Sequence, residues 1–175
     1  MSAYNGPNIL LTGPPGVGKT TVIMRLAESL AGRAVAGFYT EEIRRAGHRQ
    51  GFRAVTFSGH TATLAHVSFK SQWRVGRYGV DVSAFENLVL PELARQCELM
   101  LIDEIGKMEC FSSRFVTAVR ELLYGATPIV ATVASKGGGF IGEVKARTDV
   151  ETCEVIHANR DELPQSLAEQ LVLRM

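Results

Sequence analysis

The sequence predicts an α/β fold: a mainly parallel β-sheet with helices on both faces, in a three-layer α/β/α arrangement. Short apolar runs alternate with longer amphipathic segments, the order that builds a parallel sheet through right-handed crossovers. The first run, Asn8–Thr12, leads through a glycine-rich loop into an amphipathic helix. Two β-rich runs, Phe52–Phe57 and Thr63–Val67, flank a glycine-containing turn and predict an antiparallel hairpin added to this sheet.

The remaining strands are expected where apolar residues run without interruption, as they do in a sheet that is buried on both faces. Glu98–Asp103 is the most informative of them, because the residues from Leu99 to Ile102 are all apolar and an aspartate ends the run. The other predicted strands are Val35–Tyr39, Pro128–Val133 and Cys153–His157.

Helices are predicted where apolar residues recur at helical spacing. Ser83 and Glu86 have the spacing of a capping box at the start of one helix, and Pro91 is expected to kink that helix or split it. The other predicted helices are Lys19–Ala31, Ser112–Tyr124, Ile141–Arg147 and Pro164–Leu173.

Length and composition fit one globular domain over residues 1–175, with 46% hydrophobic residues. The formal net charge of +1 gives no global electrostatic reason to bind nucleic acid or an anionic membrane. No stretch approaches the ~18 apolar residues of a membrane span, and Met1–Pro7 is too polar for a signal peptide. Because Cys97, Cys110 and Cys153 are odd in number and form no CxxC pair, we expect reduced thiols in a cytoplasmic protein. We also expect a monomer or a weak oligomer.

A phosphate-binding loop is the strongest functional signal. Residues 13–20 match GxxxxGK[ST] between a strand and a helix, the context that this motif requires. The glycines let backbone N–H groups point at the phosphates, Lys19 reaches the β and γ oxygens, and the Thr20 hydroxyl coordinates Mg²⁺. The predicted nucleotide-binding residues of this segment are Gly13, Pro14, Pro15, Gly16, Val17, Gly18, Lys19, Thr20 and Thr21.

Two acidic residues end the predicted strand 98–103. A P-loop protein needs a carboxylate on a neighbouring strand to hold Mg²⁺, so Asp103 joins Thr20 as a predicted metal residue. Glu104 is the predicted catalytic base, because an acidic residue there can orient or deprotonate an attacking water. A kinase has less use for such a group, which favours hydrolysis. Further along, Lys107 and Glu109 either approach the nucleotide or form a solvated ion pair.

Phosphoryl transfer gains from an extra cation beside the γ-phosphate. Arg77, Lys136 and Arg147 are the candidates, and Arg77 is predicted as catalytic together with Lys19 and the base. Thr132, at the end of its strand, is either a sensor of the γ-phosphate or an ordinary strand residue.

Asn159 and Arg160 follow the last predicted strand, where a nucleotide base often packs. An arginine plane can stack on the base and an amide can approach its edge, so both are predicted to bind the nucleotide. The alternative for this segment is a helix start with Asp161 as its N-cap.

Four segments occur in an order and spacing far more specific than the P-loop alone. They are GPPGVGKTT at 13–21, GFYTEE at 37–42, VGRY at 75–78 and IDEIGKME at 102–109. Through them the chain resembles the THEP-type nucleoside-triphosphatases, the family of cancer-related nucleoside-triphosphatase, from Ile9 to about Arg160.

This resemblance implies a RecA-like P-loop fold and slow, Mg²⁺-dependent hydrolysis of several nucleotides (ATP, GTP, CTP and UTP) with loose base preference. It assigns phosphate binding to residues 13–20, Mg²⁺ to Asp103 and the base to Glu104. It also implies that Thr40, Glu41 and Glu42 lie near the γ-phosphate.

Three functions are compatible with the sequence. Hydrolysis of NTP to NDP and phosphate is favoured by Glu104 and by the family signature. A small-molecule or nucleotide kinase is an alternative, because the glycine run 137–139 could act as a lid. A nucleotide-gated, RNA-associated switch is a further alternative, suggested by hairpin cations. The cations in question are Arg44, Arg45, Arg49 and Arg53. Charged side chains on a solvated sheet edge also prevent that edge from pairing with another strand, which accounts for these arginines without RNA, so nucleic acid is not expected as a partner.

Overall fold

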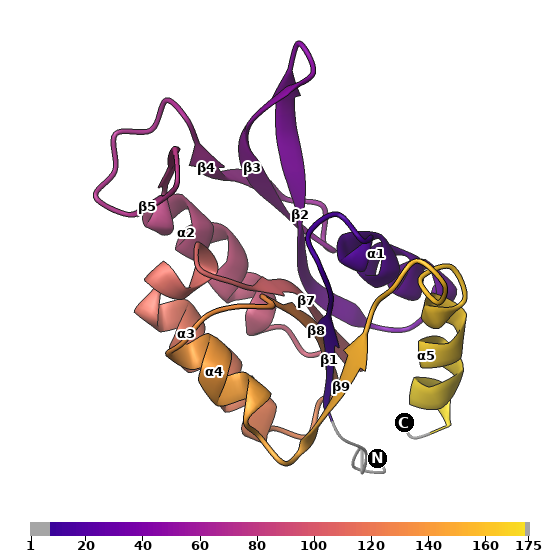
Figure 1. The fold of residues 1–175 in the computed structure, drawn as a ribbon. Coiled ribbons are helices and arrows are strands. Elements are labelled where there is room, and N and C mark those ends of the chain that lie inside the picture. Colours follow the sequence, from indigo (N-terminus) through magenta and orange to yellow (C-terminus); the bar gives the residue numbers. More distant parts are fainter. Residues whose placement is uncertain (1–7, 174–175) are drawn as a thin grey trace.

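In the computed structural model, which describes residues 8–173, nine strands form one sheet with helices on both faces (Figure 1). The strand order is β5-β6-β4-β3-β2-β7-β8-β1-β9. The predicted three-layer α/β/α fold is therefore confirmed, whereas the prediction about Met1–Pro7 lies outside the described residues.

The parallel part of the sheet carries the predicted phosphate and metal residues. Its neighbours in space are β2-β7-β8-β1-β9, and each adjacent pair is parallel. One strand, β8, separates the P-loop strand β1 from β7, so the ends of all three meet at one edge of the sheet. These strands are β1 (Asn8–Thr12), β2 (Val35–Arg45), β7 (Leu99–Ile105), β8 (Ile129–Val133) and β9 (Val150–Glu154).

Helices cover the two faces of this parallel part unevenly (Figure 1). Side chains of β7 alternate between the faces: Leu99 and Leu101 pack towards α1, and Met100 and Ile102 pack towards α2 and α3. Burial on both faces explains the continuous apolar run of this strand. One face carries α1 (Lys19–Ser29) and α5 (Leu163–Val172), and the other carries α2 (Val82–Leu93), α3 (Ser113–Tyr124) and α4 (Phe140–Lys145). Within residues 8–173, no helix has both the length and the apolar character needed to cross a membrane.

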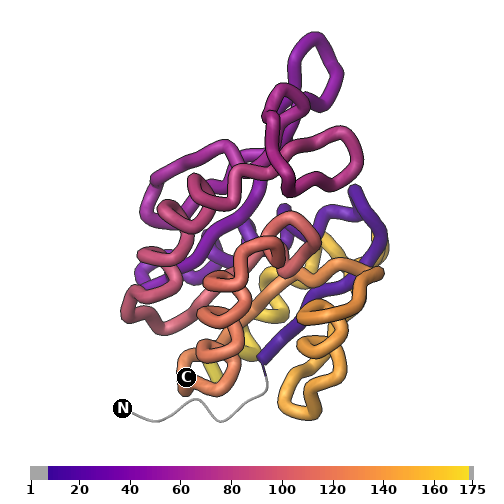
Figure 2. The backbone as a smooth tube through the Cα atoms, turned by 90° about the vertical axis from the view of Figure 1, so that its left-hand side faces the viewer, coloured from indigo at the N-terminus to yellow at the C-terminus, as the bar shows by residue number. Residues whose placement is uncertain are grey.

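The antiparallel part of the sheet is larger than predicted. The expected hairpin is present as β3 (His48–Thr56) and β4 (Thr61–His66). In addition, β2 continues past the sheet and folds back into β3, so that a two-stranded ribbon stands away from the body of the molecule (Figures 1 and 2). Beyond β4, two short strands complete the edge, β5 (Arg74–Val75) and β6 (Tyr78–Val80).

The start of α2 corrects the predicted capping box. Asp81 is the N-cap, and its carboxylate accepts a hydrogen bond from the Ala84 backbone N–H at 2.9 Å. Ser83 therefore lies inside the helix. Glu86 turns away from the helix start and accepts a hydrogen bond from the Ser112 hydroxyl at 2.6 Å.

Of the two outcomes expected for Pro91, a split of α2 is excluded, because Pro91 lies in the last turn of one continuous helix, where its missing N–H removes a single helical hydrogen bond. Two further expectations about strand and helix ends are wrong. The last strand covers Val150–Glu154 instead of Cys153–His157, because pairing with β1 ends there. Asp161 does not cap α5; its carboxylate pairs with Arg25 at 3.3 Å.

Gly37 allows β2 to pack against β7 and yields a test of the fold. Its φ is +115°, and a Cβ there would lie 1.8 Å from the Leu101 carbonyl oxygen. We expect Gly37→Ala to cost at least ~3 kcal/mol of unfolding free energy, because backbone atoms must move. Gly32 is a matched control, since it has φ +96° but open space around it, so Gly32→Ala should cost about 1–2 kcal/mol. Urea unfolding of both variants measures the difference, and equal costs would contradict the packing argument.

Candidate nucleotide and metal site

The P-loop joins β1 to α1 through glycines that have left-handed backbone angles. Gly13 has φ +144°, and a Cβ there would lie 2.6 Å from the Val155 carbonyl oxygen, so only glycine fits. Gly18 has φ +109° and occupies the N-cap of α1, where no side chain caps the helix. The N–H groups of the first turn of α1 are therefore available to an anion, and the helix dipole favours negative charge there.

The Lys19 side chain lies along the loop that precedes it. Its ammonium donates hydrogen bonds to the carbonyl oxygens of Gly13 at 2.8 Å and of Pro14 at 3.2 Å. These bonds hold the cation beside the loop that is predicted to bind the phosphates.

Asp103 is the centre of the site and is 3% exposed. One carboxylate oxygen accepts a hydrogen bond from the Thr20 hydroxyl at 2.8 Å, and the other accepts one from the Thr132 hydroxyl at 2.6 Å. Thr40 donates its backbone N–H at 3.3 Å and its hydroxyl at 3.4 Å. Donors from α1, β2 and β8 thus satisfy a carboxylate that would be costly to bury alone.

The Thr20 and Asp103 pair has the oxygen donors that suit Mg²⁺. Mg²⁺ binds hard oxygen ligands and usually takes one or two carboxylates together with phosphate oxygens and water. Among residues 8–173, no group of three or more His, Cys, Asp and Glu side chains is placed to hold a metal by itself. The residues present therefore fit an ion that arrives with a nucleotide.

Glu104 follows Asp103 through a cis peptide bond and is partly buried. Burial raises the pKa of its carboxyl above the ordinary range, the neighbouring Asp103 raises it further, and Lys19 acts in the opposite direction. A raised pKa makes this carboxylate a better proton acceptor than an exposed one.

Glu109 decides between the two interpretations that the sequence left open for this loop. Its side chain is 4% exposed, whereas Lys107 is exposed, and the described residues show no ion pair between them. The solvated ion pair is therefore wrong. Burial raises the pKa of Glu109 to about 8, and the charges of Glu104 and Asp103 add to this rise.

Arg160, which is predicted to bind the nucleotide, lies beside the P-loop. Its guanidinium donates to the Val17 carbonyl oxygen at 3.1 Å. Asn159 is placed differently, because its side-chain amide is hydrogen-bonded to the backbone of its own turn. The amide oxygen accepts from the Ile156 N–H and the amide nitrogen donates to the Glu154 carbonyl oxygen, each at 2.9 Å. A pocket of about 280 Å³ next to the loop is lined by Gly16, Gly18, Thr21, Arg25, Arg160 and Asp161.

Arg77 is not brought to the P-loop. It lies in the turn between β5 and β6, where it donates to the Arg49 carbonyl oxygen and to the Tyr78 hydroxyl. Strands β4, β3 and β2 separate this turn from β7, which carries Asp103. The sheet order therefore removes the geometric basis for Arg77 as a catalytic cation within one chain.

The segment after Thr40 also leaves the site. Glu41 pairs with Arg53 at 2.7 Å, and Glu42 pairs with Arg44 at 2.6 Å and with Arg49 at 2.8 Å. These ion pairs lie along the projecting ribbon. Of Thr40, Glu41 and Glu42, which the family resemblance places near the γ-phosphate, only Thr40 is hydrogen-bonded to Asp103. Two carboxylates thus pair with three of the four hairpin arginines and offset two of their charges, which weakens the RNA-associated alternative.

The two remaining candidate cations do not contact Asp103 either. Arg147 pairs with Asp149 at 2.6 Å and stacks over the Tyr124 ring. Lys136 is exposed in the loop after β8. Within residues 8–173, the arginine that contacts the P-loop backbone is Arg160, through Val17.

Comparison with known proteins agrees with this geometry. The model of a protein family described as NTPase matches residues 8–168. The chain belongs to this NTPase family. It is 43% identical to the human cancer-related nucleoside-triphosphatase, over 89% of this chain and 92% of the human protein. It is 41% identical to nucleoside-triphosphatase THEP1 of Natranaerobius thermophilus, over 94% of this chain and 96% of that protein.

Solved structures agree with this membership in the NTPase family. The crystal structure of THEP1 from Aquifex aeolicus superposes with a TM-score of 0.85 at 35% identity, covering 94% of this chain and 98% of that one. The solution structure of a human cancer-related nucleoside triphosphatase gives a TM-score of 0.83 at 39% identity, covering 97% and 100%. The chain therefore has the α/β fold of solved THEP1 structures, consistent with a P-loop NTPase.

Thr132 is the residue whose role the sequence left ambiguous, and it offers a test. We expect Thr132→Val to lower the turnover of the family's NTPase reaction about 10-fold, because Asp103 loses its shortest hydrogen bond. Thr56→Val is the matched control: this threonine is also buried in a strand, but its hydroxyl bonds Ser58 and His60 at a distant turn. Steady-state phosphate release measures both, and an unchanged Thr132→Val would contradict a role in holding the carboxylate.

The buried Glu109 carboxyl predicts a dependence of stability on pH. Its folded-state pKa is raised from 4.5 to about 8, so the folded state keeps a proton that the unfolded state releases. The unfolding free energy should fall as the pH rises from about 4.5 to about 8. We expect Glu109→Gln to raise Tm at pH 8, by an amount that shrinks towards pH 4.5. Thermal melts against pH measure this, with the exposed Glu121→Gln as control; a pH-independent difference would exclude the effect.

Proposed function

We propose that this chain is a Mg²⁺-dependent nucleoside-triphosphatase, a single P-loop domain over residues 1–175 that hydrolyses NTP to NDP and phosphate. The observation that carries the proposal is the 2.8 Å contact between the Thr20 hydroxyl and the Asp103 carboxylate. It joins the phosphate-binding loop to the metal carboxylate, with Glu104 next in the chain. The names of the relatives, nucleoside-triphosphatases in both human and bacterial proteins, support the same activity.

The P-loop would bind the phosphates in this reaction. Backbone N–H groups of residues 13–20 and the uncapped first turn of α1 supply fixed positive dipoles for the β- and γ-phosphates. Lys19 would exchange its bonds to loop carbonyls for bonds to phosphate oxygens, which concentrates its charge where negative charge builds up.

Thr20 and Asp103 would hold the metal ion. When bound, Mg²⁺ neutralises charge on the β- and γ-phosphates. Thr132 and Thr40 keep the Asp103 carboxylate in one orientation through their hydrogen bonds. A carboxylate fixed in this way loses little conformational entropy on binding the ion.

Glu104 would serve as the general base. Its partial burial and its neighbour Asp103 raise the pKa of its carboxyl, so it accepts a proton more readily than an exposed glutamate does. In the proposed step the water oxygen bonds to the γ-phosphorus, the bond to the β-phosphate oxygen breaks, and the water proton passes to Glu104. The NDP leaves with the bonding electron pair.

Broad specificity for the base, over ATP, GTP, CTP and UTP, is supported by the surroundings of Arg160. The guanidinium provides a plane that stacks on any base, beside a pocket of about 280 Å³. Asn159 cannot read a base edge in this geometry, because its amide is occupied by its own turn. Strong selection of one base requires hydrogen-bonding groups that the wrong base leaves unpaired, and this residue does not supply them.

The kinase alternative has one observation in its favour. Lys107, the glycine run 137–139 and the side chains of α3 line an open pocket of about 690 Å³, which could receive a phosphate acceptor. Phosphate release without any added acceptor separates the two functions.

The cytoplasmic location and the monomeric or weakly oligomeric state stay predictions.

Phosphate release from ATP, GTP, CTP and UTP with Mg²⁺ tests the proposal. We expect wild type to hydrolyse all four, Lys19→Ala to lose nucleotide binding and activity, and Glu104→Gln to bind nucleotide but turn over at least ~100-fold slower. Arg77→Ala should keep activity within about 2-fold, because that side chain binds the hairpin. Full activity of Glu104→Gln, or release that requires an acceptor, would overturn the proposed reaction.

A further inference from the structure

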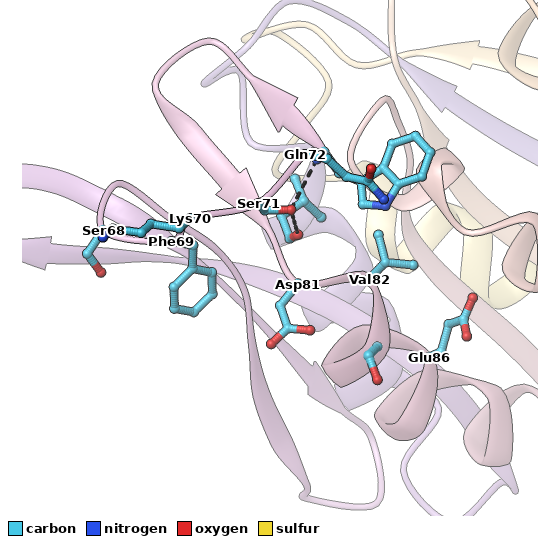
Figure 3. A pocket seen from close by; sticks show the side chains of 11 residues that line it. Ser68, Phe69, Lys70, Ser71, Gln72, Asp81, Val82 and Glu86 are labelled. Carbon is cyan, nitrogen blue, oxygen red and sulfur yellow. Dashed lines mark hydrogen bonds between the residues drawn. The ribbon is translucent and has the colours of Figure 1, made fainter.

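The short helix η1 (Glu109–Phe111) is fixed in place on the side of the site opposite the P-loop. The Phe111 ring packs on the Trp73 ring, with centroids 5.2 Å apart. Ser112, which caps α3 by accepting from the Phe115 N–H, donates to Glu86 at 2.6 Å. Figure 3 shows Glu86 on α2 at the border of an open pocket of about 650 Å³ that contains none of the predicted site residues. Ring packing and the Ser112 hydrogen bonds therefore fix η1 together with the Glu109 carboxyl, which is hydrogen-bonded by the backbone of Gly106 and of Glu109 itself.

The Glu109 carboxyl also lies near the proposed base. A Cβ placed on Gly106 would lie 2.6 Å from Glu104 Oε1 and 2.8 Å from Glu109 Oε2. One oxygen of each carboxyl group therefore lies over the same glycine, and a side chain at position 106 would displace at least one of them. Glu109 is 4% exposed, so its carboxyl is shielded from bulk water.

The charges around Glu109 are almost all negative. Helix η1 packs against β7, α2 and α3. Strand β7 contributes Asp103 and Glu104, which both raise the pKa of Glu109. Helices α2 and α3 contribute Glu86 and Arg114, which pair with each other at 3.3 Å.

The residues on either side of Glu109 do not supply a cation. The Cys110 thiol has its pKa raised to about 12 by burial and by the two glutamates, so it is neutral. Lys107 is exposed and makes no ion pair with Glu109 among the described residues. Burial and the negative charges outweigh the backbone hydrogen bonds from Gly106 and Glu109 that favour the ionised carboxylate, so the acid form is favoured at neutral pH.

From this arrangement we propose that Glu109 is a positioning residue, whose carboxylic acid fixes the Glu104 carboxylate across Gly106 for attack by water. The proposal rests on the proposed function of Glu104. An acid O–H can donate to the Glu104 carboxylate, which then keeps one rotamer facing the γ-phosphate. Ionised, Glu109 would lose that donor and add a third negative charge beside Asp103 and the nucleotide.

Two consequences distinguish this role from a structural one. The acid form is required, so turnover should fall as the pH rises through about 8, where Glu109 ionises. The amide of a glutamine also donates a hydrogen bond and does not ionise. Glu109→Gln should therefore keep turnover at pH 7 and lose the alkaline decline.

The experiment compares kcat for MgATP hydrolysis from pH 6 to 9.5 in wild type, Glu109→Gln, Glu109→Ala and Glu104→Gln, with nucleotide Kd and Tm for each. We expect Glu109→Gln to stay within about 3-fold of wild type at pH 7 with a flat alkaline limb. Glu109→Ala should lose about 10- to 100-fold in kcat with Kd unchanged. Glu92→Gln is the matched control, because Glu92 is also 4% exposed but binds the Gly37 N–H and Ser58; it should keep the wild-type pH profile.

The outcomes separate the role of Glu109 from that of Glu104. An alkaline decline in Glu109→Gln equal to that of wild type, or wild-type kcat in Glu109→Ala while Glu104→Gln is inactive, overturns the role of Glu109 alone. Full activity of Glu104→Gln overturns the proposed function itself. If Glu109→Ala does not fold, its Tm shows this, and the pH profile of the isosteric Glu109→Gln then supports or overturns the role of Glu109.

Discussion

The hydrogen bonds that converge on Asp103 are the interaction on which the site depends. A carboxylate that is 3% exposed is stable in this place because Thr20, Thr40 and Thr132 donate to it from three different elements. Removing any one donor leaves an acceptor that water cannot easily reach, at a cost of about 1–3 kcal/mol. The same bonds fix how the P-loop helix lies against the sheet edge, so folding and the geometry of the metal site have one origin.

This convergence follows from the order of the strands. Because β7 lies between β2 and β8, the ends of these three parallel strands bring Thr40, Asp103 and Thr132 to one edge. The close approach of β2 to β7 needs Gly37, since a side chain there would meet the Leu101 carbonyl. Apolar packing on both faces of β7 then holds the strand without polar groups of its own, which leaves its end free to carry the carboxylates.

How much the sequence could predict depended on whether a signal was local. The P-loop at 13–20 and the apolar strand that ends in Asp103 are contiguous patterns with a physical meaning, and they identified the fold and the centre of the site. Arg77 is predicted from its residue type and Asn159 from its place after the last predicted strand. The position of Arg77, however, depends on long-range strand order, and the Asn159 amide is bound within its own turn. Glu109 was ambiguous for the same reason, because burial of a charged residue is decided by three separate elements packing around a short helix.

The cluster of Asp103, Glu104 and Glu109 shows that function and stability pull in opposite directions in this loop. Burial and mutual repulsion raise the pKa of both glutamates, which disfavours the ionised folded state at neutral pH. A chain selected for stability alone would replace Glu109 with an apolar or amide residue, since removing such a buried acid relieves that cost. Gly106 makes the same point, because an oxygen of each carboxyl group occupies the space that a side chain at this position would need. Strain of this kind is maintained most readily where the two acids act on a common reactant, here the water beside the γ-phosphate.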